Sequence, residues 1–334
     1  MSRITLKKVA EEAGVSVQTA SHILNTTNGK SYKPATRAKV EEIAHVLGYR
    51  PNAAARSMIN QRSHIIGVIV QRLKGGWSAP MDVFEMMLGV NDVLAKSGYV
   101  TSIIPVSDLK MENAESRVFR EQILDGLFVC NLPDVEEDLI KRIAPAYIWC
   151  DTNRDLPEKC IRRDEFQAGY MVCKELVSLG YRRIVQVTYA YCSGHYSMTD
   201  RFSGIRAAAA EAGVPLEIVG CTTQNMETES ERVCKLLNTD TAVIAENYHF
   251  AMAVMQQAMA DHIIPGADYG LAACDISSER HNLWPGLAGA VVDRTEIGVE
   301  AAQMMLELLD GEIPESVTIQ PKWQPGDTVR AVSR

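Results

Sequence analysis

From His64 onward, short apolar runs of strand length alternate with longer segments that carry the apolar periodicity of an amphipathic helix. The first run, Ile65–Val70, contains no polar side chain, which is typical of a strand buried on both faces of a sheet. Strands that alternate with helices in this way form parallel sheets covered by helices on both faces. The stretch is long enough for two doubly wound lobes, in which ligands bind at the carboxyl ends of the strands.

The alternation predicts the remaining elements of this body. Further strands are expected at Thr101–Ile104, Gly126–Cys130, Ala146–Cys150, Ile184–Val187, Leu216–Val219, Ala242–Ala245, Leu271–Cys274 and Gly289–Val292. The helices are expected at Val83–Ser97, Ala114–Leu124, Val135–Ile143, Gly169–Ser178, Arg201–Ala212, Glu229–Leu237, Phe250–Ala260 and Glu296–Leu309.

The stretch Thr5–Asn25 has a different organisation, with two short apolar patterns of helical spacing on either side of Gly14. A glycine at this point allows the tight turn of a helix-turn-helix. Ser16 can cap the second helix through its hydroxyl oxygen. That helix presents a row of small and hydrogen-bonding side chains away from its apolar stripe, as the major groove of DNA requires. The row is Val17, Gln18, Ser21, His22 and Asn25.

A third helix is expected to begin at Pro34 and to end at Gly48. The segment that follows it, residues 51–62, begins with Asn52 as a possible cap and contains a run of alanines. Its helical part is about eight residues long, below the ~12–15 residues that a stable isolated helix needs. We therefore expect this segment to be helical only when a second copy or DNA holds it, and a plain helical linker is the alternative.

The charge of the chain is divided unevenly between these two parts. Residues 1–62 hold ten Lys/Arg and four Asp/Glu, a net charge of +6, whereas the remainder holds 24 and 38, a net charge of −14. A basic head on an acidic body is expected when one end of a protein meets phosphates. Lys30, Lys33, Arg37 and Lys39 are expected to contact phosphates rather than bases.

Several classes of protein lack support in the sequence. No GxGxxG follows the first strand, and no GxxxxGK[ST] or GxSxG motif occurs. The seven histidines have no metal-ligand spacing, and the eight cysteines form no CxxC pair. We therefore expect no enzyme activity, no catalytic residue, no metal site and no cofactor.

The sequence also lacks an apolar run that approaches the ~18 residues of a membrane span. Its N-terminus does not have the apolar core of a signal peptide. A cytoplasmic protein with no membrane partner is expected. A solute-binding protein without DNA function is a weaker alternative, because it would need export and would not carry the basic head.

The head resembles that of the lactose-repressor-type (LacI/GalR) transcription regulators. The matching residues are Thr5-Leu6-x-x-Val9-Ala10-x-x-Ala13-Gly14-Val15-Ser16, Gln18-Thr19-x-Ser21, Thr36-Arg37-x-x-Val40 and Gly48-Tyr49-x-Pro51-Asn52-x-x-Ala55. The body is similar to the effector domain of that family through Ile66-Gly67-Val68, Asp125-Gly126-Leu127, Leu179-Gly180-Tyr181 and Arg201-x-x-Gly204-Ile205.

This resemblance implies an all-α helix-turn-helix head and an α/β periplasmic-binding-protein-like body of two doubly wound parallel-sheet lobes. Residues 1–50 would form the DNA-binding domain, 51–62 the hinge helix and 63–334 the effector-binding and dimerisation domain. The N-lobe would take about 63–161 and 293–320, and the C-lobe about 162–292 and 321–334.

The resemblance also implies a homodimer on a pseudo-palindromic operator, with paired hinge helices in the minor groove. The residues then expected at DNA are Thr5, Ser16, Val17, Gln18, Ser21, His22, Asn25, Asn52, Ala55 and Met58. Met58 stands where the family usually has a leucine that wedges between base pairs. His22 stands where an arginine is usual, and histidine cannot read guanine bidentately, so a different operator is expected.

In that family a small molecule, often a sugar or a sugar derivative, binds between the lobes and switches the protein. The residues expected to bind it are Trp77, Asp151, Arg163, Tyr191, Arg201, Glu246, Asn247 and Asp275. Glu246-Asn247 replaces the usual Asn-Asp, which leaves open which of the two faces the ligand. Arg163 stands at a position that is often aspartate, which suggests the hypothesis of a ligand with an anionic group.

These observations predict a ligand-switched transcription regulator, and a repressor of a carbohydrate uptake or catabolic operon in particular. The alternative within the family is control by a protein partner in place of a small ligand.

Overall fold

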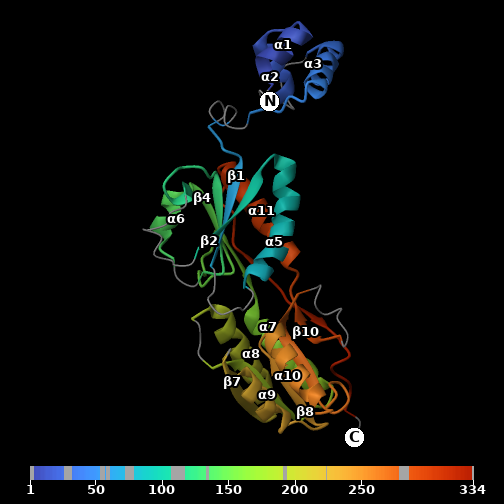
Figure 1. Cartoon of the computed structure of the whole chain (residues 1–334). Coiled ribbons are helices and arrows are strands. Elements are labelled where there is room, and N and C mark those ends of the chain that lie inside the picture. The colour runs from blue at the N-terminus through green and yellow to red at the C-terminus, as the bar shows by residue number, and fades with distance from the viewer. Residues whose placement is uncertain are drawn as a thin grey trace. The chain divides into compact units, whose positions relative to one another are not determined.

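The structure is a computed structural model, and it describes residues 4–25, 32–52, 57, 61–71, 79–106, 117–132, 135–190, 194–222, 224–277 and 286–332. The chain forms two compact units, Met1–His64 and Ile65–Arg334. Figure 1 shows the helical first unit and the two sheets of the second.

The first unit contains three helices, α1 (Leu6–Ala13), α2 (Val17–Asn25) and α3 (Pro34–Val46). Gly14 ends α1 in the left-handed conformation, with φ of 69°, which a side chain would disfavour. The helices enclose a small core of buried apolar residues, Val9, Ala10, Ala13, Ala20, Ile23, Val40 and Ala44. The predicted helix-turn-helix is therefore confirmed, and its expected apolar stripes are the residues that meet in this core.

The first lobe of the second unit has a six-stranded parallel sheet in the order β11-β5-β4-β3-β1-β2. Its strands are β1 (Ile65–Gln71), β2 (Val100–Val106), β3 (Gly126–Cys130), β4 (Ala146–Cys150), β5 (Cys160–Arg163) and β11 (Val317–Ile319). On one face the helices α5 (Ala79–Leu94) and α11 (Arg294–Leu309) pack side by side (Figure 1). Helix α6 (Glu137–Ile143) covers the other face.

The second lobe has a sheet in the order β12-β10-β9-β8-β6-β7, parallel except for β12. Its strands are β6 (Arg183–Tyr189), β7 (Leu216–Cys221), β8 (Thr241–Ala245), β9 (Gly270–Ile276), β10 (Ala288–Val291) and β12 (Lys322–Gln324). Helices α7 (Glu165–Ser178) and α8 (Tyr196–Ala212) cover one face, and α9 (Met226–Cys234) and α10 (Tyr248–Ala260) the other. The predicted fold class, with two doubly wound lobes, is confirmed.

The chain passes between the two sheets at three places, Arg163–Glu165, Val291–Arg294 and Ile319–Lys322. Two of these crossings place an arginine at their edge, Arg163 as the last residue of β5 and Arg294 as the first residue of α11. Charged side chains at crossings between lobes are well placed to respond to the angle between them.

One predicted helix is wrong where the structure describes it. Of the expected helix Ala114–Leu124, residues 117–124 contain only the 3₁₀ turn η3 (Arg117–Phe119), and residues 114–116 lie outside the described part. Leu124 is buried in the core beneath α6, with Val118, Phe119 and Ile123 packed against that core. The backbone is irregular here because packing of these apolar side chains into the core stabilises the chain more than the helix that the local pattern favours.

Three short strands were not predicted, namely β5, β11 and β12. Each has three or four residues and is held by pairing with a distant segment: β11 with β5, and β12 with β10. Strands of this length have too little pattern of their own to be recognised. The omission of β5 matters, because this strand positions Arg163.

Candidate functional site

The second helix of the head presents the surface predicted to face DNA. The Oγ of Ser16 accepts a hydrogen bond from the backbone N–H of Thr19 at 3.0 Å, which confirms the expected cap of α2. Val17 is 45% exposed and Gln18 is also exposed, whereas Ser21 and His22 are half-buried. Thus the predicted face of α2 is open, with its apolar side turned into the core.

The other residues predicted at DNA have different positions. Thr5 caps α1, accepting from the N–H of Lys8 at 3.4 Å. Asn25 is the last residue of α2, and Asn52 is exposed. Ala55 and Met58 lie outside the described residues, so their expected contacts with DNA stay predictions from the sequence.

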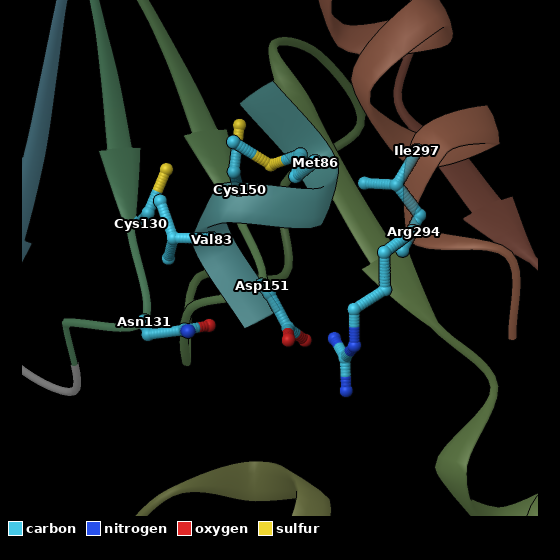
Figure 2. Close-up of a pocket in the computed structure, with 8 residues that line it drawn as sticks. All are labelled: Val83, Met86, Cys130, Asn131, Cys150, Asp151, Arg294 and Ile297. Atoms are coloured by element: carbon cyan, nitrogen blue, oxygen red, sulfur yellow. The ribbon is translucent and has the colours of Figure 1, made fainter. Parts of the chain in front are cut away.

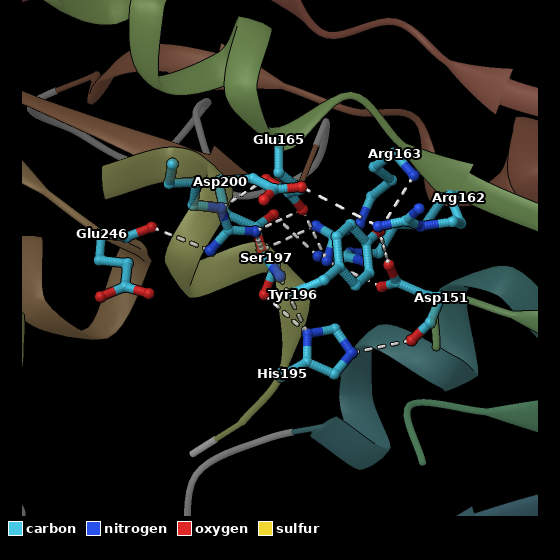
Figure 3. Close-up of polar contacts among 12 residues, drawn as sticks. Asp151, Arg162, Arg163, Glu165, His195, Tyr196, Ser197, Asp200 and Glu246 are labelled. Carbon is cyan, nitrogen blue, oxygen red and sulfur yellow. Dashed lines mark hydrogen bonds and ion pairs between the residues drawn. The ribbon is translucent and has the colours of Figure 1, made fainter. Parts of the chain in front are cut away.

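In the second unit, six charged residues form one network at the interface of the two lobes, and Figure 3 shows three of them, Asp151, Arg163 and Glu165. Five of the six are buried, and the side chain of Asp275 is 11% exposed. The positive members are Arg163, Arg201 and Arg294, and the negative members are Asp151, Glu165 and Asp275. The three positive and three negative charges give the network a net charge of zero. Because charges this deeply buried are costly unless they are paired, the pairing of all six explains how the network is tolerated.

Asp275 is the centre of this network. It follows Cys274 in β9 of the second lobe and accepts from Arg201 of the same lobe at 2.8 Å. It also accepts from two residues of the first-lobe elements, Arg163 at 2.9 Å and Arg294 at 2.8 Å. Burial alone would raise the pKa of Asp275, but the arginines, Arg294 foremost, hold it well below its ordinary range. This carboxylate is therefore ionised and ties the lobes together.

Arg163 has three carboxylate partners. It lies 2.8 Å from Asp151, 2.9 Å from Glu165 and 2.9 Å from Asp275. Burial by itself would raise the pKa of Asp151 too. The positive charge of Arg163 contributes most to holding the pKa of this carboxyl below its ordinary value. The guanidinium of Arg163 is thus committed to groups of the protein itself.

A second set of contacts between the lobes joins the loop after β4 to the beginning of α8. The Tyr196 hydroxyl donates to the Asp151 carboxylate at 2.5 Å, and His195 Nε2 donates to the Asp151 carbonyl at 2.9 Å. Asn153 donates to the Gly194 carbonyl at 2.6 Å and accepts from the Tyr196 N–H at 2.8 Å. The loop and the helix are therefore joined by polar contacts that depend on the angle between the lobes.

A close contact of two helices positions the Arg201–Glu165 pair. A Cβ atom on Gly204 of α8 would lie 2.1 Å from the Phe166 carbonyl oxygen of α7. One on Gly169 of α7 would lie 2.2 Å from the Arg201 carbonyl oxygen. Since only glycine permits this approach, Arg201 Nε reaches Glu165 at 2.5 Å.

The Glu246–Asn247 pair divides into two roles. Asn247 caps α10 by accepting from the N–H groups of His249 and Phe250, at 3.0 and 3.2 Å. Glu246 is 1% exposed; its Oε2 accepts from Thr188 and from the Tyr189 N–H, while no described residue is a partner of its Oε1. Burial raises the pKa of Glu246 above its ordinary value. Of the two, Asn247 has a structural role, and Glu246 keeps a carboxyl oxygen without a hydrogen-bond partner among the described residues.

A pocket of about 260 Å³, a volume that includes its opening to solvent, lies beside the network in the first lobe (Figure 2). It is lined by Val83, Met86, Cys130, Asn131, Cys150, Asp151, Arg294 and Ile297. Asn131 and Asp151 directly follow the neighbouring strands β3 and β4 and have positive φ values of 53° and 55°. Asn and Asp tolerate this conformation better than most residues, and such positions cluster at functional sites.

The structure therefore brings together five of the eight residues predicted to bind an effector: Asp151, Arg163, Arg201, Glu246 and Asp275. Trp77 and Tyr191 lie outside the described residues. Sequence reasoning missed Asn131, Glu165, Tyr196 and Arg294. Asn131 could have been found, because it directly follows a predicted strand, as Asp151 does.

Two parts of the chain match known families. Residues 5–52 match the bacterial regulatory proteins of the lacI family, and residues 173–329 match the periplasmic binding protein-like domain. The regulator DegA of Bacillus subtilis is 27% identical over 313 residues, which cover 89% of each chain. The repressor PurR of Vibrio parahaemolyticus is 25% identical over 354 residues, covering 98% of this chain and 99% of its own.

Solved structures have the same fold. The lac repressor dimer bound to operator and an anti-inducer superposes with a TM-score of 0.78, at 21% identity, over 99% of this chain and all of the other. The regulator CelR in complex with cellobiose gives 0.65 at 19% identity, over 98% of this chain and all of the other. Within the described residues, no helix is long and apolar enough to cross a membrane. The chain belongs to the lacI family of bacterial regulatory proteins and is a DNA-binding transcription regulator.

Proposed function

We propose that the protein is a repressor of a carbohydrate uptake or catabolic operon, switched by a small molecule that binds between the two lobes. The observation that carries this proposal is the charge network, in which Asp275 of the second lobe meets Arg163 and Arg294 of the first. A site built from both lobes changes when the angle between them changes. A ligand that favours one angle therefore shifts the population of the two states.

The route from the site to DNA runs through the residues between the head and β1. Effector binding alters the angle of the lobes and thereby the spacing of two hinge segments, residues 51–62, in a dimer. The sequence predicts a helical part of about eight residues in this segment, too short to be stable without support, so a change of spacing is expected to melt it. A coupling free energy of about 1–3 kcal/mol is typical of such switches.

A homodimer is supported by an apolar surface on the first lobe. Phe84 and Leu88 of α5 are 52% and 50% exposed, and they stand one helical turn apart. Val100 and Ile103 of the sheet-edge strand β2, which contacts α5, are 64% and 50% exposed. Exposed apolar side chains on adjoining elements are typical of an interaction surface, and a second copy would bring two DNA-binding heads to the two halves of a pseudo-palindromic operator.

Because the protein acts on DNA, we infer a cytoplasmic location, and a role other than that of an enzyme. The residues assigned to the effector are Asp151, Arg163, Arg201, Glu246 and Asp275, joined by Asn131 and Arg294. Asn247 has a structural role as the cap of α10.

Selection of binding sites from a random duplex library with the full chain tests the proposed function. We expect a pseudo-palindromic sequence, bound ~10³-fold or more tightly than unrelated DNA at the same salt concentration. Equal binding to all sequences would contradict the proposal. Addition of candidate effectors to the complex then tests the switch, and a complex that responds only to a protein partner would favour the alternative control.

A further inference from the structure

Three sulfur atoms lie at one end of the pocket in the first lobe. They belong to Cys130 at the end of β3, Cys150 at the end of β4 and Met86 of α5, and all three side chains line the pocket. Figure 2 shows these sulfur atoms at the end that faces away from the polar side chains of Asn131 and Asp151. The three residues are 5% exposed or less. The pocket therefore has a buried end rich in sulfur, separate from its polar end.

The two thiols are neighbours because of the register of the sheet. Cys130 and Cys150 lie directly opposite each other in the parallel strands β3 and β4. Neighbouring strands are ~4.7–4.9 Å apart, and directly opposed residues project to the same face of a sheet. The two thiols accordingly form a hydrogen bond with each other. Because a metal–sulfur bond is ~2.3 Å long, two sulfur atoms this close can bind the same ion.

Met86 supplies a third sulfur atom from outside the sheet. Its helix, α5, packs on the face of the sheet to which the two cysteines project. A thioether is an uncharged acceptor, so it can bind a metal ion without losing a proton. Among the described residues, no three His, Cys, Asp or Glu side chains form a group that could hold a metal ion, so a site here needs the thioether. The available ligands are therefore two thiols and one thioether.

The oxygen ligand nearest to these sulfur atoms is already in use. Asp151 lines the same pocket, but its carboxylate is paired with Arg163 at 2.8 Å and accepts a hydrogen bond from the Tyr196 hydroxyl. The other neighbours of the sulfur atoms, Val83 and Ile297, are apolar. Zn²⁺ usually takes four ligands from thiolate, imidazole and carboxylate groups, whereas thioether and thiolate ligands together favour Cu⁺. The composition of this end of the pocket therefore favours a soft ion.

The charge of a monovalent ion is also suited to this buried place. Burial above all, with the Cys130 thiol and the charge of Asp151, raises the pKa of the Cys150 thiol well above its usual value, so the thiol by itself is neutral. A monovalent cation that displaces one thiol proton exchanges one positive charge for another. The cost of burying an additional net charge is thereby avoided.

We propose that Cys130, Cys150 and Met86 form a binding site for a soft monovalent metal ion, of which Cu⁺ is the representative. At least one thiol loses its proton to water as the metal–sulfur bonds form. None of the residues assigned to the effector is a ligand of this ion, so the inference goes beyond the proposed function. The expectation of no metal site rested on ligand spacing in the sequence, whereas these two cysteines meet only through the pairing of β3 with β4.

Titration of the full chain with Cu⁺ against a chromophoric Cu⁺ chelator, without oxygen and without added thiols, tests this inference. We expect the protein to retain one ion per chain in this competition. Prior addition of excess Zn²⁺ should leave the binding of Cu⁺ unchanged. Displacement of Cu⁺ by Zn²⁺ would contradict the assignment of the site to a soft ion.

Two variants locate the ion. Met86→Leu changes the volume little and removes the thioether, and even indirect partners of metal ligands contribute ~10–100-fold to affinity, so we expect a loss of about 10-fold or more. Cys150→Ser should lose the retained ion. The matched controls are Met255→Leu in α10 and Cys173→Ser in α7, both buried in the second lobe, and they should bind Cu⁺ as the original protein does. Circular dichroism verifies that each protein is folded.

An unchanged Cu⁺ affinity in either Met86→Leu or Cys150→Ser would overturn the inference, as would failure of the original protein to retain the ion. If Cys150→Ser does not fold, the conservative Met86→Leu variant still decides the outcome. Selective binding to DNA is measured without metal and is unaffected by these results. Failure of the inference and failure of the proposed function are therefore distinguishable.

Discussion

Arg163, at the end of β5, and Asp275, in β9, lie 112 positions apart in the sequence and 2.9 Å apart in space, and they join the sheets of the two lobes. The same carboxylate accepts from Arg294 and Arg201. The two lobes are thus held together by charges of the protein itself.

Replacement of Asp275 by Asn should destabilise the body strongly. It leaves three buried arginines without their shared carboxylate, and removal of one partner of a buried ion pair costs about 3–5 kcal/mol. Urea unfolding of the two proteins measures this loss. Asp138→Asn, at a 92% exposed side chain, is the control and should change the free energy of unfolding by less than about 1 kcal/mol. Equal losses in the two variants would show that the network contributes little.

The stability of the body should fall in acid because of Asp151 and Asp275. The pKa of each carboxyl is lower in the folded protein than in the unfolded chain, where it is ~3.9. The unfolded chain therefore binds more protons, and the free energy of unfolding decreases as the pH falls from about 5 through 3.9 toward the folded-state values. Asp151→Asn removes one of these groups and should reduce the slope of unfolding free energy against pH in this range. An unchanged slope would contradict the assignment.

The contribution of Glu246 to stability should depend on pH in the opposite sense to that of Asp151 and Asp275. Burial raises its folded-state pKa above the unfolded value of ~4.3, so the folded protein binds the extra proton. The contribution of this group to stability decreases as the pH rises from about 4 toward its raised pKa. Glu246→Gln removes the titration, and its stability relative to the original protein should improve between pH 4 and 7. Thermal melts at several pH values measure the difference, and a constant difference would indicate an ionised Glu246 throughout.

Gly204→Ala should disturb the contact of α7 with α8. The new Cβ would lie 2.1 Å from the Phe166 carbonyl oxygen, so the helices must separate. Overpacking of this kind costs about 1–3 kcal/mol, and it should also weaken effector binding, because Arg201 and Glu165 face each other across the same helices. Ser203→Ala, at the neighbouring exposed position, should do neither. A fully stable Gly204→Ala protein would show that the helices tolerate a wider spacing.

On the DNA side, Gln18→Ala should reduce specific binding by about 1–3 kcal/mol and relax the preference for one base pair. Gln18 is exposed on α2 and carries an amide that can read adenine. Lys39→Ala, at an exposed basic position of α3, should instead weaken binding to all sequences and lower the slope against log salt by about 1. Fluorescence anisotropy on a selected operator and a scrambled duplex separates the two effects. Equal losses on both duplexes for Gln18→Ala would remove it from the base-reading face.

The elements with strong local patterns were predictable. The apolar spacing in α1 and α2, the cap at Ser16 and the left-handed Gly14 depend on residues a few positions apart. The strands β3, β4 and β8 are buried throughout and consist almost entirely of apolar and aromatic residues, so they too were recognisable. The expected helix at Ala114–Leu124 failed because its apolar side chains are buried in irregular backbone.

By itself, the sequence determined the helix-turn-helix, the two-lobed parallel architecture and most of the polar residues at the strand ends, because periodicity, capping and strand composition act over short distances. Only the tertiary structure decided which charges pair. Arg163 suggested an anionic ligand when it was considered alone, and its three carboxylate partners, Asp275 from 112 positions away among them, show that its charge is already balanced. Ionic interactions in a buried site depend on distance in space, and the fold alone brings residues 151, 163 and 275 within hydrogen-bonding distance.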